Sequence, residues 1–126
     1  MFAAGCGRLF EGTPAQMHDS LNVQIGGLAD DTELYFGHEY TEANLRFALS
    51  VESRNAEIQH KLEAVSALCS SGKFSTPTTL AEERLTNPFM RCTSAEILAC
   101  VKSKEPDHNL EEEEVFRTLR ELKNNY

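Results

Sequence analysis

The segment Gly37–Thr41 marks the point where a short apolar run gives way to side chains capable of chemistry. The preceding run, Leu34–Phe36, is rich in aromatic residues and typical of a strand end, and Thr41 is expected to begin a helix. His38 should therefore lie at a strand-to-helix corner, which holds a side chain on a rigid scaffold while leaving it accessible. Such a histidine suits a metal ligand or an acid–base group. A hydrogen-bonded structural histidine is the alternative that these five residues leave open.

Three cations near the C-terminus, Arg117, Arg120 and Lys123, recur at intervals of three residues. This spacing places them on one face of a helix. Beside Arg8 and Tyr40, such a cluster would suit a small anion with more than one carboxylate. The alternative is that the three cations form ion pairs on a solvated helix, with Glu113, Glu114 and Glu121 as partners.

Other catalytic patterns are missing from the sequence. A hydrolytic metal site needs several His, Asp or Cys ligands, including a closely spaced pair, and no such pair occurs. There is no Gly-x-Ser-x-Gly motif and no phosphate-binding loop. We expect His18, His60 and His108 to face solvent. Cys6 lies in a glycine turn that could activate a thiolate, but no histidine is near it in sequence, so a cysteine hydrolase is a minor alternative.

The formal net charge of −8 argues against a nucleic-acid partner, because it would repel a phosphate backbone and no basic stripe offsets it. Much of the excess comes from the run Glu111–Glu114. This run could be an acidic interaction tail. We interpret it as the first turn of a helix, where acidic side chains complement the positive end of the helix macrodipole.

The size of the chain, 126 residues, fits one domain, and its hydrophobic content of 40% allows a modest core. No apolar run approaches the roughly 20 residues that cross a bilayer, so we expect no membrane partner. The opening residues do not have the pattern of a secretory signal peptide. The four cysteines have irregular spacing without a Cys-x-x-Cys pair. We therefore expect a soluble, cytoplasmic protein with reduced thiols.

Periodicity, capping residues and breakers predict a mainly helical chain. The caps are Thr13, with Pro14 at the first helical position, then Asn55, and finally a capping box made of Thr93 and Glu96. The expected helices cover residues 14–25, a stretch after Thr41, the residues between Asn55 and Gly72, and 80–84, 93–102 and 110–123, with an irregular connection at 73–79.

Strand signals are confined to the first third of the chain, at Met1–Ala4 and Glu33–Phe36. Two short strands cannot make a self-sufficient sheet. We expect the N-terminal third either to pair with a sheet supplied elsewhere or to be frayed. The apolar opening segment favours the first alternative, because it has the character of the end of a longer strand.

Four segments carry a further signal, and they occur in this order: Ala4–Thr13, Gly37–Leu45, Thr79–Glu83 with Asn87–Arg91, and Leu119–Lys123. Together they resemble the hydroxyacylglutathione hydrolases, also called glyoxalase II, of the metallo-β-lactamase superfamily. The resemblance spans the whole chain.

The resemblance implies a mainly α fold. Residues 42–126 would be the C-terminal helical domain of glyoxalase II, and residues 1–41 a short strand-containing remnant of the metallo-β-lactamase αββα domain. The family hydrolyses glutathione thioesters such as S-D-lactoylglutathione, using a dinuclear site for zinc, with iron or manganese as other options.

The same resemblance implies roles for individual residues. His38 matches a metal-binding histidine, and Arg8, Tyr40, Arg120 and Lys123 match residues that hold glutathione. Phe10 stands where many members have a glutathione-binding tyrosine, so one hydroxyl contact is missing.

The sequence departs from the family in lacking its Thr-His-x-His-x-Asp-His metal motif. A single histidine cannot hold a dinuclear centre. We therefore expect a C-terminal, glutathione-binding portion of such an enzyme, inactive by itself and not retaining zinc alone. Its partners would be glutathione or its thioester and an N-terminal metal-binding half. A mitochondrial form is left open. The alternative is a non-catalytic helical module that pairs with a separate N-terminal subunit.

Overall fold

The regular structure of the chain is mostly helical, which confirms the prediction of a mainly α fold. The computed structural model describes all residues from Met1 to Tyr126. The elements are α1 (Pro14–His18), the π-helical segment η1 (Asp19–Ile25), β1 (Glu33–Leu34), α2 (Thr41–Val51), α3 (Ala56–Ser70), β2 (Thr78–Thr79), α4 (Leu80–Thr86), the 3₁₀ turn η2 (Pro88–Met90), α5 (Ala95–Lys104) and α6 (Glu112–Asn124).

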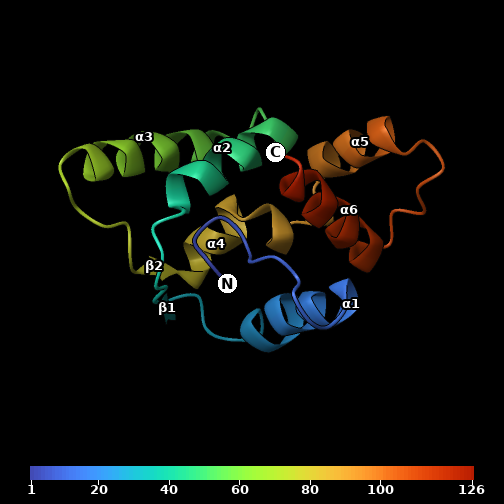
Figure 1. The fold of residues 1–126 in the computed structure, drawn as a ribbon, viewed down its shortest axis with the longest axis horizontal. Coiled ribbons are helices and arrows are strands. Elements are labelled where there is room, and N and C mark those ends of the chain that lie inside the picture. The colour runs from blue at the N-terminus through green and yellow to red at the C-terminus, as the bar shows by residue number, and fades with distance from the viewer.

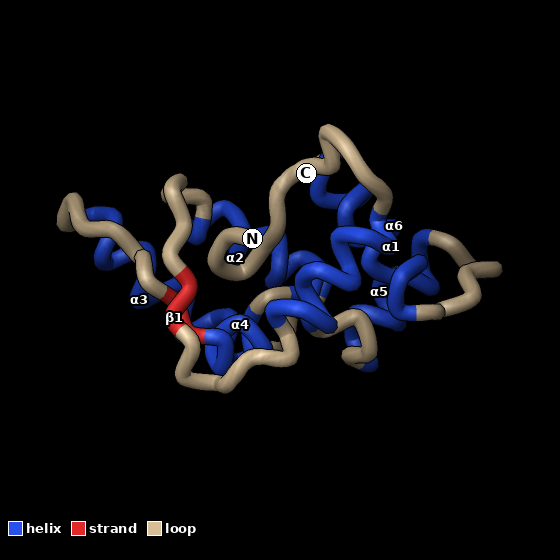
Figure 2. Tube along the Cα trace, turned by 90° about the horizontal axis from the view of Figure 1, so that it is seen from below, coloured by secondary structure: helices blue, strands red, loops and turns tan.

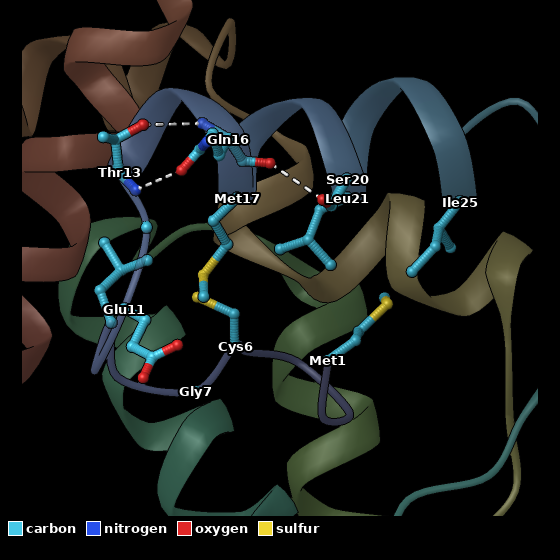
Figure 3. Close-up of a pocket in the computed structure, with 12 residues that line it drawn as sticks. Met1, Cys6, Gly7, Glu11, Thr13, Gln16, Met17, Ser20, Leu21 and Ile25 are labelled. Atoms are coloured by element: carbon cyan, nitrogen blue, oxygen red, sulfur yellow. Dashed lines mark hydrogen bonds between the residues drawn. The ribbon is translucent and has the colours of Figure 1, made fainter.

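The predicted helix over residues 14–25 is present, but its second part is π-helical. Thr13 caps α1, and Gln16 completes a capping box by accepting a 2.9 Å hydrogen bond from the Thr13 backbone (Figure 3). Met17 and Leu21 point from this helix toward Cys6 (Figure 3). The sequence gives no sign of the wider π turn, which depends on how the segment packs.

The α2–α3 hairpin forms one side of the molecule, where its two helices lie next to each other (Figure 1). Asn55 caps α3 as predicted, because its side chain accepts hydrogen bonds from the backbone N–H groups of Glu57 and Ile58. The hairpin packs on the N-terminal turn through a small apolar cluster. The buried members of this cluster are Ala4, Leu45, Ala48, Ile58 and Val65.

A larger core joins α6 to the rest of the chain. Its centre is aromatic: Phe89 lies edge-on to Phe116, with ring centroids 5.2 Å apart, and stacks against Phe47 at 6.2 Å. Residues from α5 and η1 complete it. Aromatic rings bury large apolar areas, so these three side chains contribute substantially to the core.

The predicted irregular connection over residues 73–79 is present at residues 73–77, but Thr78 and Thr79 form a strand of a short sheet. Strand β1 pairs antiparallel with β2, so that Glu33 lies opposite Thr79 and Leu34 opposite Thr78 (Figure 2). The partner of β1 is therefore supplied by this chain. Two threonines carry no alternation of apolar and polar residues, and periodicity cannot detect so short a strand.

Residues 1–5 form a turn, which corrects the prediction of a strand there. Phe2 and Gly5 exchange both backbone hydrogen bonds, at 3.0 and 3.1 Å, and Ala4 adopts a positive φ of 53°. No other strand of the chain lies beside this segment. Its inward-facing amide at Ala4 is bound instead by the buried carboxylate of Glu83, at 2.8 Å.

The start of α5 differs from the prediction, whereas the start of α6 agrees with the interpretation of the acidic run. Ser94 occupies the N-cap position of α5 without a side-chain capping bond, and the Thr93–Glu96 capping box does not form. The Glu96 carboxylate instead accepts hydrogen bonds from Ser53 and the backbone of Arg54, a tertiary contact that the local pattern could not reveal. Helix α6 places Glu112, Glu113 and Glu114 in its first turn, as predicted for the acidic run.

The histidines are less exposed than predicted. His60 faces solvent as expected, but His18 packs edge-on against Phe116 at 5.7 Å. His108 is 8% exposed and bound on both ring nitrogens, by the backbone N–H of Leu110 and the hydroxyl of Thr118. Both expectations for solvent exposure were wrong, because loop and helix neighbours cover these rings.

Contacts cross the predicted boundary between residues 41 and 42 at several places. Helix α1 packs on α6, and the Asn44 amide donates a 2.9 Å hydrogen bond to the Ala3 carbonyl. The division into residues 1–41 and 42–126 stays a prediction.

All four cysteines are unpaired thiols. None of the helices combines the length and the apolar character that crossing a membrane would require.

Candidate functional site

All five residues predicted to form a site line one cavity of about 580 Å³. They come from distant parts of the chain: Arg8 follows the N-terminal turn, His38 and Tyr40 precede α2, and Arg120 and Lys123 lie on the last turns of α6. Phe10 lines the same cavity and is 90% exposed. The structure thus brings the predicted residues together.

The segment Gly5–Gly7 reaches the cavity only because its first residue has no side chain. A Cβ atom on Gly5 would lie 2.8 Å from the side chain of Asn44, closer than real Cβ contacts allow. Asn44 is buried in the cavity wall and holds the Ala3 carbonyl, and the Asn87 amide donates to the Gly5 carbonyl at 3.2 Å. These two amides fix the turn against α2 and α4.

Arg120 is a buried cation with no carboxylate partner. It is 4% exposed, and its Nη1 donates to the carbonyl oxygens of Cys6 at 2.6 Å and Gly7 at 3.2 Å. Its guanidinium carbon lies 5.2 Å from the centroid of the Phe89 ring. Carbonyl dipoles and an aromatic face stabilise the positive charge without neutralising it.

Lys123 lies one turn further along the same helix. Its Nζ is 4.8 Å from the centroid of the Phe47 ring. Burial, followed by the neighbouring charge of Arg120, lowers the pKa of Lys123 to about 8. The ammonium group therefore stays charged at neutral pH but is easily perturbed.

The lack of counter-ions distinguishes these two cations from the others that are partly buried. Lys61 pairs with Glu83 at 3.1 Å, Arg91 with Glu52 at 2.6 Å, and Arg117 with Glu114 at 2.8 Å. Neither Arg120 nor Lys123 has a carboxylate within 4.0 Å, although the chain carries a net charge of −8. Leaving buried cations unpaired is costly, so the cavity is suited to an anion that supplies the missing charge.

The three-cation cluster predicted on the last helix is split by the structure. Arg117 faces away from the cavity and bonds Glu114 and Glu121, each at 2.8 Å. The ion-pair alternative is therefore right for Arg117. Arg120 and Lys123 are the two members that line the cavity.

His38 and Tyr40 form an aromatic wall of the cavity. Their rings stack at 5.1 Å with an interplanar angle of 21°, and Phe2 meets both edge-on, at 5.9 and 5.2 Å. Nowhere in the chain do three His, Cys, Asp or Glu side chains gather as metal ligands. The donors of this chain therefore do not fit a dinuclear metal centre by themselves, and His38 could supply only one ligand of such a centre.

Residues 39–126 match the family model described as the C-terminus of hydroxyacylglutathione hydrolase. The chain belongs to this family. The hydroxyacylglutathione hydrolase of Pseudomonas fluorescens (strain SBW25) is 44% identical over all 126 residues, which are 49% of that relative. The enzyme of Dechloromonas aromatica (strain RCB) is 55% identical over 98 residues, or 78% of this chain and 37% of the relative.

A third hydroxyacylglutathione hydrolase, from Synechococcus sp. (strain ATCC 27144 / PCC 6301 / SAUG 1402/1), is 50% identical over 110 residues, covering 87% of this chain and 42% of the relative. The chain thus spans about half the length of the curated relatives, or less. The resemblance inferred from the four sequence segments is confirmed. The individual roles of Arg8, His38, Tyr40, Arg120 and Lys123 stay predictions.

Cys6 is not an activated thiol in this member of the hydroxyacylglutathione hydrolase family. It is 4% exposed, and burial raises the pKa of its thiol above the usual value, although the nearby Arg120 acts in the opposite direction. The Gly5–Gly7 turn serves to bring backbone carbonyls to Arg120. The geometry therefore does not support a cysteine hydrolase.

A second cavity of about 440 Å³ lies on the other side of Cys6 and Gly7. Figure 3 shows Met1, Met17 and Ile25 pointing into it. Glu11 carries the only charged side chain in its lining. This apolar cavity with one acidic side chain is unsuited to an anion, so we place the candidate site in the cavity that holds Arg120 and Lys123.

Sequence reasoning missed the residues beneath and beside the two cations. Phe47 and Phe89 support Lys123 and Arg120, and Asn44 holds the turn that faces them. Phe89 lies in Asn87–Arg91, one of the segments that carry the family resemblance, but that segment gave no sign of a contact with Arg120. No local signal links Phe47 to Lys123, because the two residues meet only in the folded protein.

Proposed function

We propose that this chain is the glutathione-binding portion of a hydroxyacylglutathione hydrolase that converts S-D-lactoylglutathione into glutathione and D-lactate. The observation that carries the proposal is the pair of unneutralised cations, Arg120 and Lys123, in a cavity that Arg8 also lines. Glutathione carries two carboxylates, and charge-assisted hydrogen bonds from Arg and Lys to carboxylates are among the stronger polar contacts in proteins. Arg120 and Lys123 would hold a carboxylate remote from the thioester, with Arg8 and Tyr40 at the rim.

The catalytic metal ions would require ligands beyond this chain. We propose that His38 supplies one ligand and that an N-terminal metal-binding half supplies the others. When bound, a pair of zinc ions, or of iron or manganese, would provide the activated water that the hydrolysis requires. The part of this chain is to bind and orient the glutathione moiety.

Calorimetry with S-methylglutathione tests the binding role, since this thioether analogue cannot be hydrolysed. We expect measurable binding to the wild-type chain, and a Kd about 10- to 100-fold higher for Arg120→Met and for Lys123→Met, the range expected for one charge-assisted bond. Arg117→Met is the matched control, because it removes a cation from the same helix outside the cavity. No heat at millimolar S-methylglutathione with the wild-type chain would overturn the proposal.

The metal role of His38 requires a complete enzyme, made by joining this sequence to the N-terminal half of the Pseudomonas fluorescens relative. His38→Gln should lower the metal content per polypeptide, whereas the exposed His60→Gln should leave it unchanged. Retention of the full metal content by His38→Gln would exclude His38 as a ligand. The chain alone, supplied with zinc, should hydrolyse S-D-lactoylglutathione no faster than zinc alone.

A further inference from the structure

Two aromatic rings lie beneath the two unpaired cations. Lys123 Nζ is 4.8 Å from the Phe47 centroid, and the Arg120 guanidinium carbon is 5.2 Å from the Phe89 centroid. The two rings stack on each other at 6.2 Å with an interplanar angle of 19°. The cations and rings thus form two layers, with the charges on the side of the cavity.

We propose that Phe47 and Phe89 are positioning residues that hold Lys123 and Arg120 at the anion site in place of carboxylate counter-ions. This inference rests on the proposed function for the identity of the anion. The faces of aromatic rings attract cations through the ring quadrupole, which carries no net charge. The positive charge therefore stays available to a ligand.

The contrast with Arg91 supports this role. Arg91 is held by Glu52 through two hydrogen bonds, at 2.6 and 2.9 Å, so its charge is already matched. A carboxylate placed beneath Lys123 or Arg120 in the same way would compete with an incoming anion. An aromatic ring gives support without that competition.

The rings are also rigid enough to fix the positions of the cations. Phe47 and Phe89 are 1% and 0% exposed, and Phe89 packs edge-on against the buried Phe116. On the other side, the carbonyl groups of Cys6 and Gly7 fix the Arg120 guanidinium. A support held from several elements limits the rotamers that the two long side chains can sample.

Stepwise fluorination of Phe47 tests the inference with little change in shape. Fluorine withdraws electron density from the ring face and weakens its attraction for a cation. In the ligand-free wild-type chain, NMR titration of the Lys123 side chain should give a pKa near 8. We expect that pKa to fall with each added fluorine, by about half a unit or more in total for the trifluoro ring.

Phe116 is the matched control, because it is equally buried and no cation lies over its ring. Fluorination at Phe116 should leave the pKa of Lys123 unchanged. The corresponding series at Phe89 should speed the exchange of the Arg120 Nε–H with solvent. A Lys123 pKa that does not move along the Phe47 series would overturn the positioning role.

The ligand-free titration and the binding measurement separate the two proposals. If the pKa of Lys123 follows the fluorination of Phe47 but S-methylglutathione does not bind, the cation support stands and the glutathione-binding function fails. If S-methylglutathione binds equally well across the Phe47 series and the pKa is constant, the glutathione-binding function stands and the inference about Phe47 is wrong.

Discussion

The backbone N–H of Ala4 donates a 2.8 Å hydrogen bond to Oε2 of Glu83, a carboxylate with no exposed surface. The same oxygen accepts from the Asn87 amide, also at 2.8 Å. The other oxygen accepts from Lys61 at 3.1 Å and from the Thr78 hydroxyl at 3.0 Å. One side chain therefore ties the N-terminal turn to α3, β2 and α4.

Glu83→Gln should be strongly destabilising. The substitution leaves Lys61 without its charge partner and turns an amide group toward donors that need an acceptor. Removing one partner of a buried ion pair costs about 3–5 kcal/mol. Urea unfolding should show this loss. Glu63→Gln, on the exposed face of α3, is the control and should change the free energy of unfolding by less than about 0.5 kcal/mol. Equal effects of the two substitutions would refute a central role for Glu83.

Gly5→Ala should reduce both stability and ligand binding, because its Cβ would lie 2.8 Å from the Asn44 side chain. We expect a cost of about 1–3 kcal/mol, as for overpacking elsewhere in protein interiors. Gly37→Ala is the control, since nothing lies within 4 Å of its Cβ position. A double-mutant cycle with Asn44→Ala should show coupling between the two positions. Additive effects in that cycle would mean that the close approach to Asn44 is not the cause.

The affinity for an anion should depend on pH through Lys123. Because the pKa of Lys123 lies at about 8, the ammonium group is charged below that pH and neutral above it. Binding of S-methylglutathione should therefore weaken as the pH rises from 7 to 9, and Lys123→Met should remove most of this dependence. Calorimetry across that range is the measurement. A wild-type pH profile that is retained in Lys123→Met would assign the dependence to another group.

The lowered pKa of Lys123 has the opposite effect on folding. In the absence of a ligand, it makes the folded chain more stable as the pH rises. The unfolded chain binds the Lys123 proton more tightly than the folded chain, whose pKa is lowered to about 8. The penalty for burying the charge is thus fully present below pH 8 and is relieved as the pH rises toward the ordinary lysine value of about 10.4. The stability difference between Lys123→Met and wild type should accordingly shrink from pH 7 to pH 10 in urea unfolding.

Glu52 should contribute stability that acid removes. Burial would raise the pKa of Glu52, but hydrogen bonds from Arg91, Ser94 and Asn55 outweigh it and lower the pKa. Its contribution is present above the unfolded value of about 4.3 and is lost as the pH falls through the lower folded value. Glu52→Gln should cost about 3 kcal/mol at pH 7 and much less near pH 3, by urea unfolding. A cost that is independent of pH would show that packing, and not charge, determines the effect.

Most helices were predictable because their signals are local. Thr13 and Asn55 cap helices as expected, and the acidic run begins α6. The failures involve distant partners. Strand β2 exists only because β1 lies beside it, and Glu96 turns from its own helix end to Ser53 and Arg54. Local patterns contain no information about such contacts.

In the candidate site, too, residues with a local signal were predictable and residues that depend on distant contacts were not. Spacing on the last helix placed Arg120 and Lys123 on one face, and the corner before Thr41 indicated His38. The family resemblance then implied glutathione-binding roles for Arg8 and Tyr40. Spacing also grouped Arg117 with Arg120 and Lys123, but three nearby glutamates bind it instead. The aromatic support could not be predicted, because Phe47 and Phe89 reach the cations only after α2, η2 and α6 have packed together.

The bond from Arg120 Nη1 to the Cys6 carbonyl joins residues that are 114 positions apart in the chain. Closing so long a loop is entropically unfavourable until the intervening helices have formed and packed. We therefore expect the cavity to assemble late in folding. A growing chain would have no anion site until its last helix was synthesised, so the ligand could stabilise the finished fold but could not guide the early steps toward it.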